Sequence, residues 1–232
     1  MVYTNPRMKE DDQNLFYSSD LYSKIYQPQT SSSSHLIKAE EKVANYKSKL
    51  SENKNITGIL FLDQLTKHID YKKIKNICEI GSGSGANLIP FIQNGIASYG
   101  IELSPTLSKF AKKHGVLDNY KSIDALDMSF DVILMIHSLE HMYDPKKVLK
   151  SLRNKINKYL VIEIPGVVNR VTHIVNAHNF YFSPNTLQSL LGKCGFKCIS
   201  IHQNSKNNFI LGIFEPSKSF DFNFSKSDEV KK

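Results

Sequence analysis

His137, Glu140 and His141 are the residues of this chain best suited by type and spacing to acid–base chemistry. They follow the apolar run Val132–Ile136, which predicts a buried strand. An imidazole titrates near neutral pH, so His137 or His141 can serve as a general base. The pattern His-x-x-Glu-His also occurs in one class of zinc protease, where both histidines lie on one helix. Because His137 ends an expected strand, we predict that the chain is not such a protease.

A second set of residues forms a loop suited to holding a ligand. Gly81, Gly83 and Gly85 follow the apolar stretch Ile77–Ile80, and Glu102 lies further along the chain. Glycine has no Cβ, so the backbone of such a loop can approach a ligand closely. A carboxylate about twenty residues later, at the end of the next strand, can accept hydrogen bonds from ribose hydroxyls. The pattern therefore predicts a nucleoside-containing cofactor.

The identity of that cofactor depends on Glu79. The pattern Gly81-x-Gly83-x-x-Ala86 also satisfies the dinucleotide fingerprint, so an NAD-dependent oxidoreductase is one alternative. Glu79, however, places a carboxylate beside the loop, where it would repel a pyrophosphate. The same carboxylate suits a ligand that carries an ammonium and a sulfonium group.

The elements that must position these residues alternate from Ile74 onward between short apolar runs and helical stretches. This alternation predicts an α/β fold, a Rossmann-like doubly wound sheet that is mainly parallel. Two final strands joined by the polar turn Asn204–Asn207 predict a hairpin and an antiparallel strand at the C-terminal end. The expected strands are 74–80, 98–103, 119–123, 130–137, 159–164, 197–202 and 208–214, and the expected helices are 86–94, 105–114, 145–155 and 183–193.

The chain divides into three expected parts. Residues 1–60 are polar and form an N-terminal helical cap over the cofactor cleft, with helices expected at 35–50 and 57–68 around the cap boundary. The domain that carries the motifs spans 61–216, and 217–232 form a mobile tail. The cap contains an aromatic set that can either stack on a ligand or pack against the sheet domain. Its members are Phe16, Tyr17, Tyr22 and Tyr26.

The composition indicates in which cellular compartment the protein works and which class of molecule it binds. The 232 residues include three cysteines, an odd number that argues against a disulfide framework and for a reducing compartment. No apolar run is long enough to cross a bilayer and the N-terminus does not resemble a signal peptide, so we predict a cytoplasmic protein. The net charge of +8 is spread along the chain rather than gathered in a run. It favours an anionic small molecule over nucleic acid.

At this point the motifs resemble those of class I S-adenosylmethionine-dependent methyltransferases, in particular the small-molecule branch with type 11 and type 23 domains. The resemblance covers roughly residues 74–214. The residues that carry it are Glu79-x-Gly81-x-Gly83-x-Gly85, Glu102, Phe130-Asp131-Val132-Ile133, Leu139-Glu140-His141-x-x-Asp144-Pro145, Ile162-Glu163-Ile164-Pro165, His178-x-x-Tyr181-Phe182-Ser183-x-x-Thr186-Leu187 and Gly195-Phe196.

The resemblance implies S-adenosyl-L-methionine as cofactor. It implies that the glycine loop holds the methionine part, that Glu102 holds the ribose, and that Asp124 is the candidate contact for adenine. The full set of expected cofactor residues is Glu79, Gly81, Ser82, Gly83, Gly85, Glu102, Leu103, Asp124 and Ile136.

The candidate catalytic residues are His137, His141, His178 and Tyr181, with His137 preferred as base. A structural role is an equal alternative for His141 and Glu140. No metal is assigned, although some members of the branch bind a divalent ion with an acidic residue where His137 stands. A metal held by His137, Glu140 and His141 therefore stays open as an alternative.

The expected activity is O-methylation of a small polar acceptor, such as a sugar, a nucleotide sugar or a phosphorylated surface-glycan precursor. N-methylation of a small amine is the nearest alternative, because the same scaffold supports both. Further alternatives are an oxidoreductase, an RNA-binding methyltransferase and a catalytically silent domain. The expected partner is a small, anionic molecule rather than nucleic acid, and a homodimer is compatible with the sequence.

Overall fold

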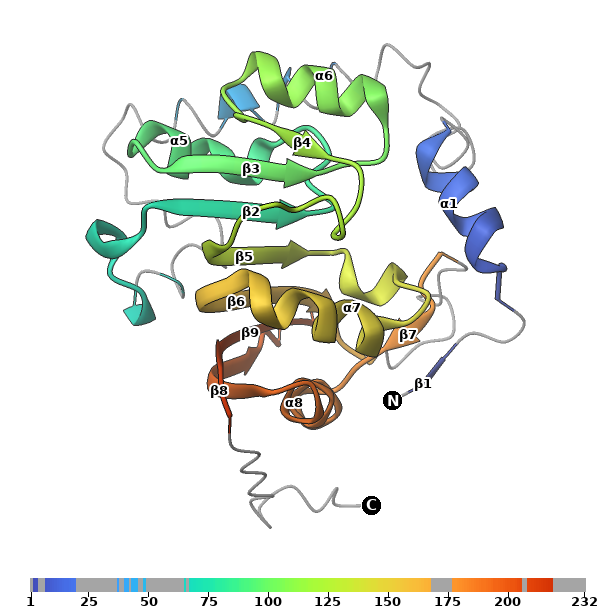
Figure 1. Ribbon diagram of the computed structural model, residues 1–232. Helices are drawn as coiled ribbons and strands as arrows, with labels where there is room; N and C mark the ends of the chain where they lie inside the picture. Colours follow the sequence, from blue (N-terminus) through green and yellow to red (C-terminus); the bar gives the residue numbers. More distant parts are fainter. Residues whose placement is uncertain are drawn as a thin grey trace.

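The computed structural model describes residues 2–3, 7–19, 67–167, 177–205 and 208–218, together with residues 37, 40, 41, 43–45, 48 and 65. Its centre is a seven-stranded sheet (Figure 1). The strands, in spatial order, are β4 (Asn119–Tyr120), β3 (Ala97–Ile101), β2 (Asn76–Ile80), β5 (Phe130–Ile136), β6 (Ile156–Pro165), β9 (Phe209–Pro216) and β8 (Phe196–Gln203).

The strand directions confirm the predicted fold class. Strands β4, β3, β2, β5 and β6 pair in parallel, and β9 is antiparallel to both β6 and β8. The last strand of the chain is thus inserted between two earlier ones, which makes the predicted hairpin an antiparallel part of the sheet. The expected strand 119–123 is shorter than predicted, since β4 covers only Asn119–Tyr120.

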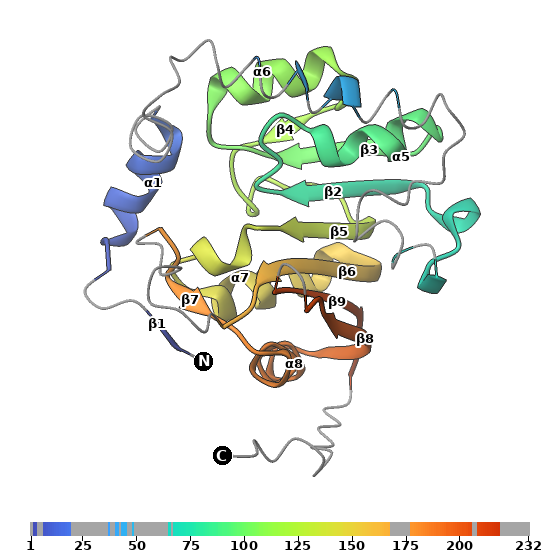
Figure 2. The same cartoon turned by 180° about the vertical axis from the view of Figure 1, so that it is seen from behind.

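Helices cover both faces of the sheet, as Figures 1 and 2 show from opposite sides. Residues of β5 alternate between two apolar clusters, because successive strand side chains point to opposite faces. Ile133 packs with residues of α7 and α8, and Val132 packs with residues of η2, α5 and α6. The described helices from residue 71 onward are η1 (Tyr71–Lys73), η2 (Ala86–Leu88), α5 (Ile89–Gln93), α6 (Pro105–Lys113), η3 (Leu139–His141), α7 (Pro145–Leu152), η4 (Arg153–Lys155) and α8 (Pro184–Lys193).

Local sequence explains where three of these helices begin. Ser104, Asp144 and Ser183 each precede a proline, and each side chain accepts a hydrogen bond from a backbone N–H in the first turn. A proline at the first helical position loses nothing, because its missing N–H would have no partner within the helix. At α8 the Thr186 side chain also accepts from the Ser183 backbone, which completes a capping box.

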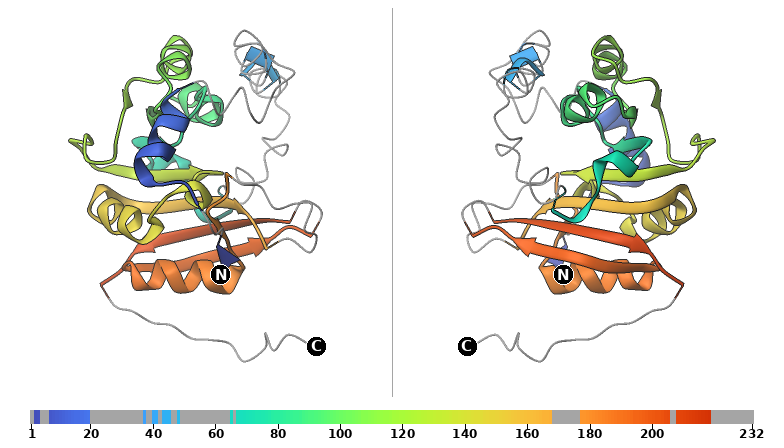
Figure 3. Two further views of the ribbon diagram at one scale, coloured as in Figure 1. Left: turned by 90° about the vertical axis from the view of Figure 1, so that its right-hand side faces the viewer. Right: turned by 90° about the vertical axis from the view of Figure 1, so that its left-hand side faces the viewer.

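The N-terminal segment lies across the edge of the sheet at which the parallel strands end (Figures 1 and 3). Strand β1 (Val2–Tyr3) pairs antiparallel with β7 (Phe180–Tyr181), and helix α1 (Glu10–Ser18) follows. The guanidinium of Arg7 donates to the Tyr143 carbonyl oxygen at 3.0 Å and lies 4.2 Å from the centre of the Tyr143 ring. The sequence predicted neither β1 nor its pairing with β7.

Several expectations lie largely or wholly outside the described residues. Residues 20–36, with Tyr22 and Tyr26, and the tail beyond residue 218 are among them. The helices expected at 35–50 and 57–68 are described at a few positions only, and all of these positions are helical. The division of the chain at residues 60 and 216 therefore stays a prediction.

All three cysteines are free thiols, as the sequence predicted. Cys78 and Cys194 are buried and Cys198 is half-buried, where burial raises the pKa of its thiol to about 11. Among the helices of the described residues, none has the length and apolar character that a membrane crossing requires.

Asp131 of β5 links neighbouring strands by hydrogen bonds, at the edge of the sheet opposite the glycine loop. Its carboxylate is 6% exposed and accepts hydrogen bonds from the Lys75 amide at 2.9 Å and the Lys158 ammonium at 3.0 Å. Burial opposes its ionisation, but these donors outweigh that effect and lower the pKa of Asp131. The ionised form is therefore favoured more strongly in the folded chain than in the unfolded one.

We expect Asp131→Asn to lower the free energy of unfolding by about 1–3 kcal/mol at pH 7. A lowered folded-state pKa stabilises the fold above the ordinary carboxyl pKa, and this stabilisation is lost as the pH falls through the folded-state value. The difference between wild type and variant should therefore shrink at pH 3 in urea unfolding. Asp70→Asn removes an exposed carboxylate paired with Lys73 at 3.4 Å and serves as the control. It should change stability by less than about 0.5 kcal/mol. An equal loss in both variants would contradict the role of Asp131.

Candidate functional site

The glycine loop joins β2 to η2 at the carboxyl-terminal edge of the sheet. The amides of Gly81 and Ser82 both donate to the Ile101 carbonyl oxygen, at 2.9 and 3.0 Å, so the loop is fastened to the end of β3. Gly81, Gly83 and Gly85 all have positive φ angles, which explains why glycine is needed at this turn. The crevice outside the strand ends is where open α/β sheets bind ligands.

Two of these glycines serve different purposes. At Gly85 a Cβ atom would lie 2.8 Å from Val116 Cγ2, so this glycine permits close packing of the loop onto the chain beyond α6. At Gly83, with a φ angle of 54°, a Cβ atom would meet no atom of the described residues within 4 Å. Gly83 therefore leaves open space against the backbone, as a bound ligand would require.

Glu102 and Glu79 lie on either side of this loop. The Glu102 carboxylate accepts from the Gly83 amide and from the Ser104 amide, each at 2.7 Å, while burial raises its pKa. Glu79 is 1% exposed and accepts from Asn87 Nδ2 at 2.6 Å. Glu102 thus fixes the loop, and Glu79 fixes the helical turn that follows it. Sequence reasoning did not single out Asn87.

The remaining expected cofactor residues have different surroundings. Ser82 is buried and its hydroxyl donates to Asn119 Oδ1 at 3.2 Å, which directs the side chain away from solvent. Leu103 is half-buried two residues after β3, and Ile136 is buried at the end of β5. Asp124 is exposed in a turn between β4 and β5. The contact of Asp124 with adenine stays a prediction.

His137 lies between two carboxylates. Its Nδ1 is 3.6 Å from Glu140 Oε1 and its Nε2 is 3.4 Å from Glu163 Oε1. Burial lowers the pKa of His137, but these carboxylates outweigh it and raise the pKa to about 9. The backbone φ angle is 51°, a left-handed conformation that is uncommon outside glycine. A raised pKa favours the protonated ring, which donates hydrogen bonds, at neutral pH. The role of His137 as base stays a prediction.

His141 is held by the chain on both sides of it. Its Nδ1 lies 2.7 Å from the Ala177 carbonyl oxygen and 2.9 Å from the Tyr17 hydroxyl of α1. A carbonyl oxygen can only accept, so Nδ1 carries the hydrogen and Nε2 of the neutral ring keeps its lone pair. Gln13 of α1 donates to the His141 carbonyl oxygen. Helix α1 of the N-terminal segment thus contacts His141 directly. The sequence predicted only that aromatic residues of this segment could pack against the sheet domain.

His178 lies beside His141, and Tyr181 lies beside His178. The ring centre of His178 is 4.8 Å from that of His141 and 5.7 Å from that of Tyr181. Burial and the neighbouring His141 lower the pKa of His178 to about 4, despite the opposing charge of Glu140. Tyr181 is 4% exposed and belongs to β7. The structure therefore brings together His137, His141 and His178, with Tyr181 behind them.

Asn179 is a site residue that sequence reasoning missed. It is 4% exposed, and its Nδ2 donates to the carbonyl oxygens of His141 at 2.9 Å and Met142 at 3.3 Å. Its backbone amide donates to the Glu140 carbonyl oxygen at 2.9 Å. Asn179 therefore fixes the turn that carries Glu140 and His141. The only signal in the sequence was its position between His178 and Tyr181.

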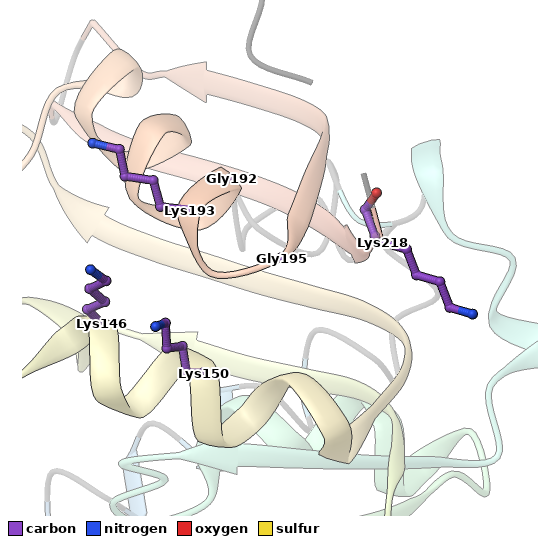
Figure 4. Close-up of a pocket in the computed structure, with 7 residues that line it drawn as sticks. Lys146, Lys150, Gly192, Lys193, Gly195 and Lys218 are labelled. Carbon is purple, nitrogen blue, oxygen red and sulfur yellow. The ribbon is translucent and has the colours of Figure 1, made fainter. Parts of the chain in front are cut away.

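A hollow of about 540 Å³ lies elsewhere, lined by residues of α7, α8 and the chain after β9 (Figure 4). Ser217 directly follows β9, which runs antiparallel to β6, so the hollow reaches the amino-terminal edge of the parallel strands. This is the edge away from the glycine loop. The hollow therefore does not belong to the site, although it gathers part of the positive charge. The lining lysines are Lys146, Lys150, Lys193 and Lys218.

Solved structures share this fold at low sequence identity. A methyltransferase from Thermotoga maritima, described as a possible histamine N-methyltransferase, is 21% identical over 67% of this chain and 87% of its own, with a TM-score of 0.53. Magnesium protoporphyrin IX methyltransferase from Synechocystis, with bound S-adenosylhomocysteine, is 12% identical over 90% and 100%, with a TM-score of 0.61. A (4+2)-cyclase is 12% identical over 67% and 79%, with a TM-score of 0.56.

The family assignment comes from the sequence profile of the methyltransferase domain, which matches residues 39–201 and hence more than half of the chain. No curated protein matches the chain significantly. The profile contains the glycine loop, Glu102 and the cluster around His141, so it includes the residues that the fold brings to one edge. The chain belongs to the class I S-adenosylmethionine-dependent methyltransferases.

Proposed function

We propose that this methyltransferase acts on a hydroxyl group of a small polar acceptor, such as a sugar, a nucleotide sugar or a phosphorylated sugar precursor. The observation that carries the proposal is the group of polar side chains near the ends of β5 and β6 and just before β7. A hydroxyl-rich acceptor offers both donors and acceptors to such a group, whereas an apolar acceptor would leave them unpaired. The group consists of His137, Glu140, His141, Glu163 and His178.

The residues of the glycine loop fit S-adenosylmethionine. The open space at Gly83 admits a ligand against the backbone, and the Glu102 carboxylate beside it retains acceptor capacity for ribose hydroxyls. Glu79 contributes negative charge close to the loop, which suits a cationic ligand. When bound, this cofactor supplies a methyl group on a sulfonium that is already a good leaving group.

The chain's own contribution is mainly to position the acceptor. Aligning two reactants in a productive geometry can supply a large part of a rate enhancement. His141 is fixed by Ala177 and Tyr17, and His137 is fixed by Glu140 and Glu163. Helix α1 covers this edge through Gln13 and Tyr17, which limits access of water to the acceptor. These contacts orient an acceptor hydroxyl and shield it.

The test has two parts. Calorimetry should show binding of S-adenosylhomocysteine but not of NAD, with weaker binding by Glu102→Ala and unchanged binding by Glu215→Ala, which removes a carboxylate near the opposite edge. Methyl transfer from labelled S-adenosylmethionine is then measured on sugars, sugar phosphates, nucleotide sugars and small amines. Labelling of the hydroxyl acceptors supports the proposal. Labelling of amines alone would replace it with N-methylation, and tight binding of NAD alone would overturn it.

A further inference from the structure

Glu140 is a buried carboxylate without a hydrogen-bond donor among the described residues. Its side chain is fully buried, and neither oxygen accepts a hydrogen bond in that part of the chain. The nearest nitrogen atoms of basic side chains are His137 Nδ1 at 3.6 Å and His141 Nε2 at 3.8 Å, both beyond hydrogen-bond distance. Burying a charge without such partners is costly, so the site is built for something that compensates it.

Charge in the surroundings does not balance Glu140. His137 lies between Glu140 and a second carboxylate, Glu163, which is itself 7% exposed. The two carboxylates therefore share the single imidazole of His137. A positively charged ligand would give Glu140 a partner of its own.

His141 presents a lone pair to the same place. Because Nδ1 donates to the Ala177 carbonyl oxygen, the neutral ring keeps its lone pair on Nε2, the atom that faces Glu140 Oε1 at 3.8 Å. Two electron-rich atoms thus face each other. Metal-bound histidines typically donate their other ring N–H to a carbonyl or carboxylate, which fixes the tautomer and the ring orientation. Ala177 provides that arrangement for His141.

His178 completes a set of three. Glu140, His141 and His178 each offer one ligand atom, and these atoms lie within 4.8 Å of one another. Ligands bound at about 2.1 Å to one ion are at most about 4.2 Å apart, so small side-chain rotations bring the three into range. Because His178 is half-buried, the site also has an open side.

We propose that Glu140, His141 and His178 bind a divalent transition metal ion. Two imidazoles and one carboxylate favour Zn²⁺, Co²⁺ or Fe²⁺ over Mg²⁺ and Ca²⁺, which prefer oxygen ligands. The set differs from the one considered from sequence, since His178 takes the place of His137. With three protein ligands the ion keeps an open position, where it would hold an oxygen of the acceptor. This last role rests on the proposed function, whereas the metal site does not.

The test measures metal binding without cofactor or acceptor. The untagged full-length chain is stripped with a chelator, dialysed into metal-free buffer and titrated with ZnCl₂ by calorimetry. We expect one Zn²⁺ per chain. Glu140→Gln and His178→Ala should each weaken the binding at least about 100-fold, since each removes one of three ligands. His202→Ala removes an exposed histidine of β8 and should bind as the wild type does.

Co²⁺ provides an independent readout through its visible absorption. The wild type and His202→Ala should show the same d–d bands, and Glu140→Gln should lose or shift them. If Glu140→Gln does not fold by circular dichroism, the half-buried position 178 still decides the question. No Zn²⁺ binding by the wild type, or equal binding by all variants, would overturn the inference. A chain that binds Zn²⁺ but methylates no hydroxyl would uphold this inference and end the proposed function.

Discussion

Replacing Gly83 by leucine is expected to weaken binding of S-adenosylhomocysteine at least about 100-fold, or about 2.7 kcal/mol. The new side chain would occupy the open space beside the Glu102 carboxylate, where we expect the cofactor to approach the backbone of the loop. The left-handed conformation of residue 83 adds a strain of about 1–2 kcal/mol for any residue with a Cβ. This strain would also lower the free energy of unfolding, so the effect on ligand binding has to be compared with that of a variant under the same strain.

Gly95 provides a control with the same backbone cost. Its φ angle is 74°, and a Cβ atom there would also meet no described atom within 4 Å. It lies between α5 and β3, at the edge of the sheet away from the glycine loop. Gly95→Leu should therefore lose similar stability in thermal unfolding and bind the ligand normally in calorimetry. If Gly83→Leu also bound normally, the loop would not be the cofactor site.

The second large effect is expected at Asn179. In Asn179→Asp the donor that serves the His141 and Met142 carbonyl oxygens becomes a third acceptor in a buried place. Leaving these groups unsatisfied should cost about 2–3 kcal/mol in urea unfolding. The turn with Glu140 and His141 should also shift, and misplacing an active-site group by about 1 Å can lower turnover about 100-fold.

Two comparisons separate this effect from a general loss of the fold. Binding of S-adenosylhomocysteine should stay within about threefold of wild type, because the glycine loop is held by other contacts. Asn94→Asp removes an amide donor to the Pro90 carbonyl oxygen on an exposed turn and should change stability by less than about 0.5 kcal/mol. Turnover of Asn179→Asp equal to that of wild type would show that the residue only maintains the turn.

Much of the fold could be predicted from sequence, because its determinants are local. The apolar runs at β2, β5 and β6 are long and regular, and the helices after Ser104, Asp144 and Ser183 begin with recognisable caps. Such patterns depend on neighbours in the chain. The two-residue strand β4 falls below the length at which periodicity is informative, so its extent was overestimated.

The site was predicted less completely, because several contacts of its histidines join segments that are distant in the sequence. The glycine loop and Glu102 follow two successive parallel strands, β2 and β3, so their proximity could be predicted from the order of elements. The tautomer of His141 is set by the Ala177 carbonyl oxygen, and the ring also contacts the Tyr17 hydroxyl; these residues lie 36 and 124 residues away in the chain. The raised pKa of His137 depends on Glu163 in another strand as well as on nearby Glu140. No spacing rule predicts such contacts, so the sequence alone could not give the full surroundings of His137 and His141.

The pairing of β1 with β7 has a consequence for synthesis of the chain. Val2 is synthesised about 180 residues before its partner Tyr181. At about 5–20 residues per second, the N-terminal segment waits on the order of 10–40 s for that partner. Such distant contacts also form slowly, because the intervening loop has to close. Assembly of this edge therefore follows the synthesis of the parallel strands β2, β3, β5 and β6.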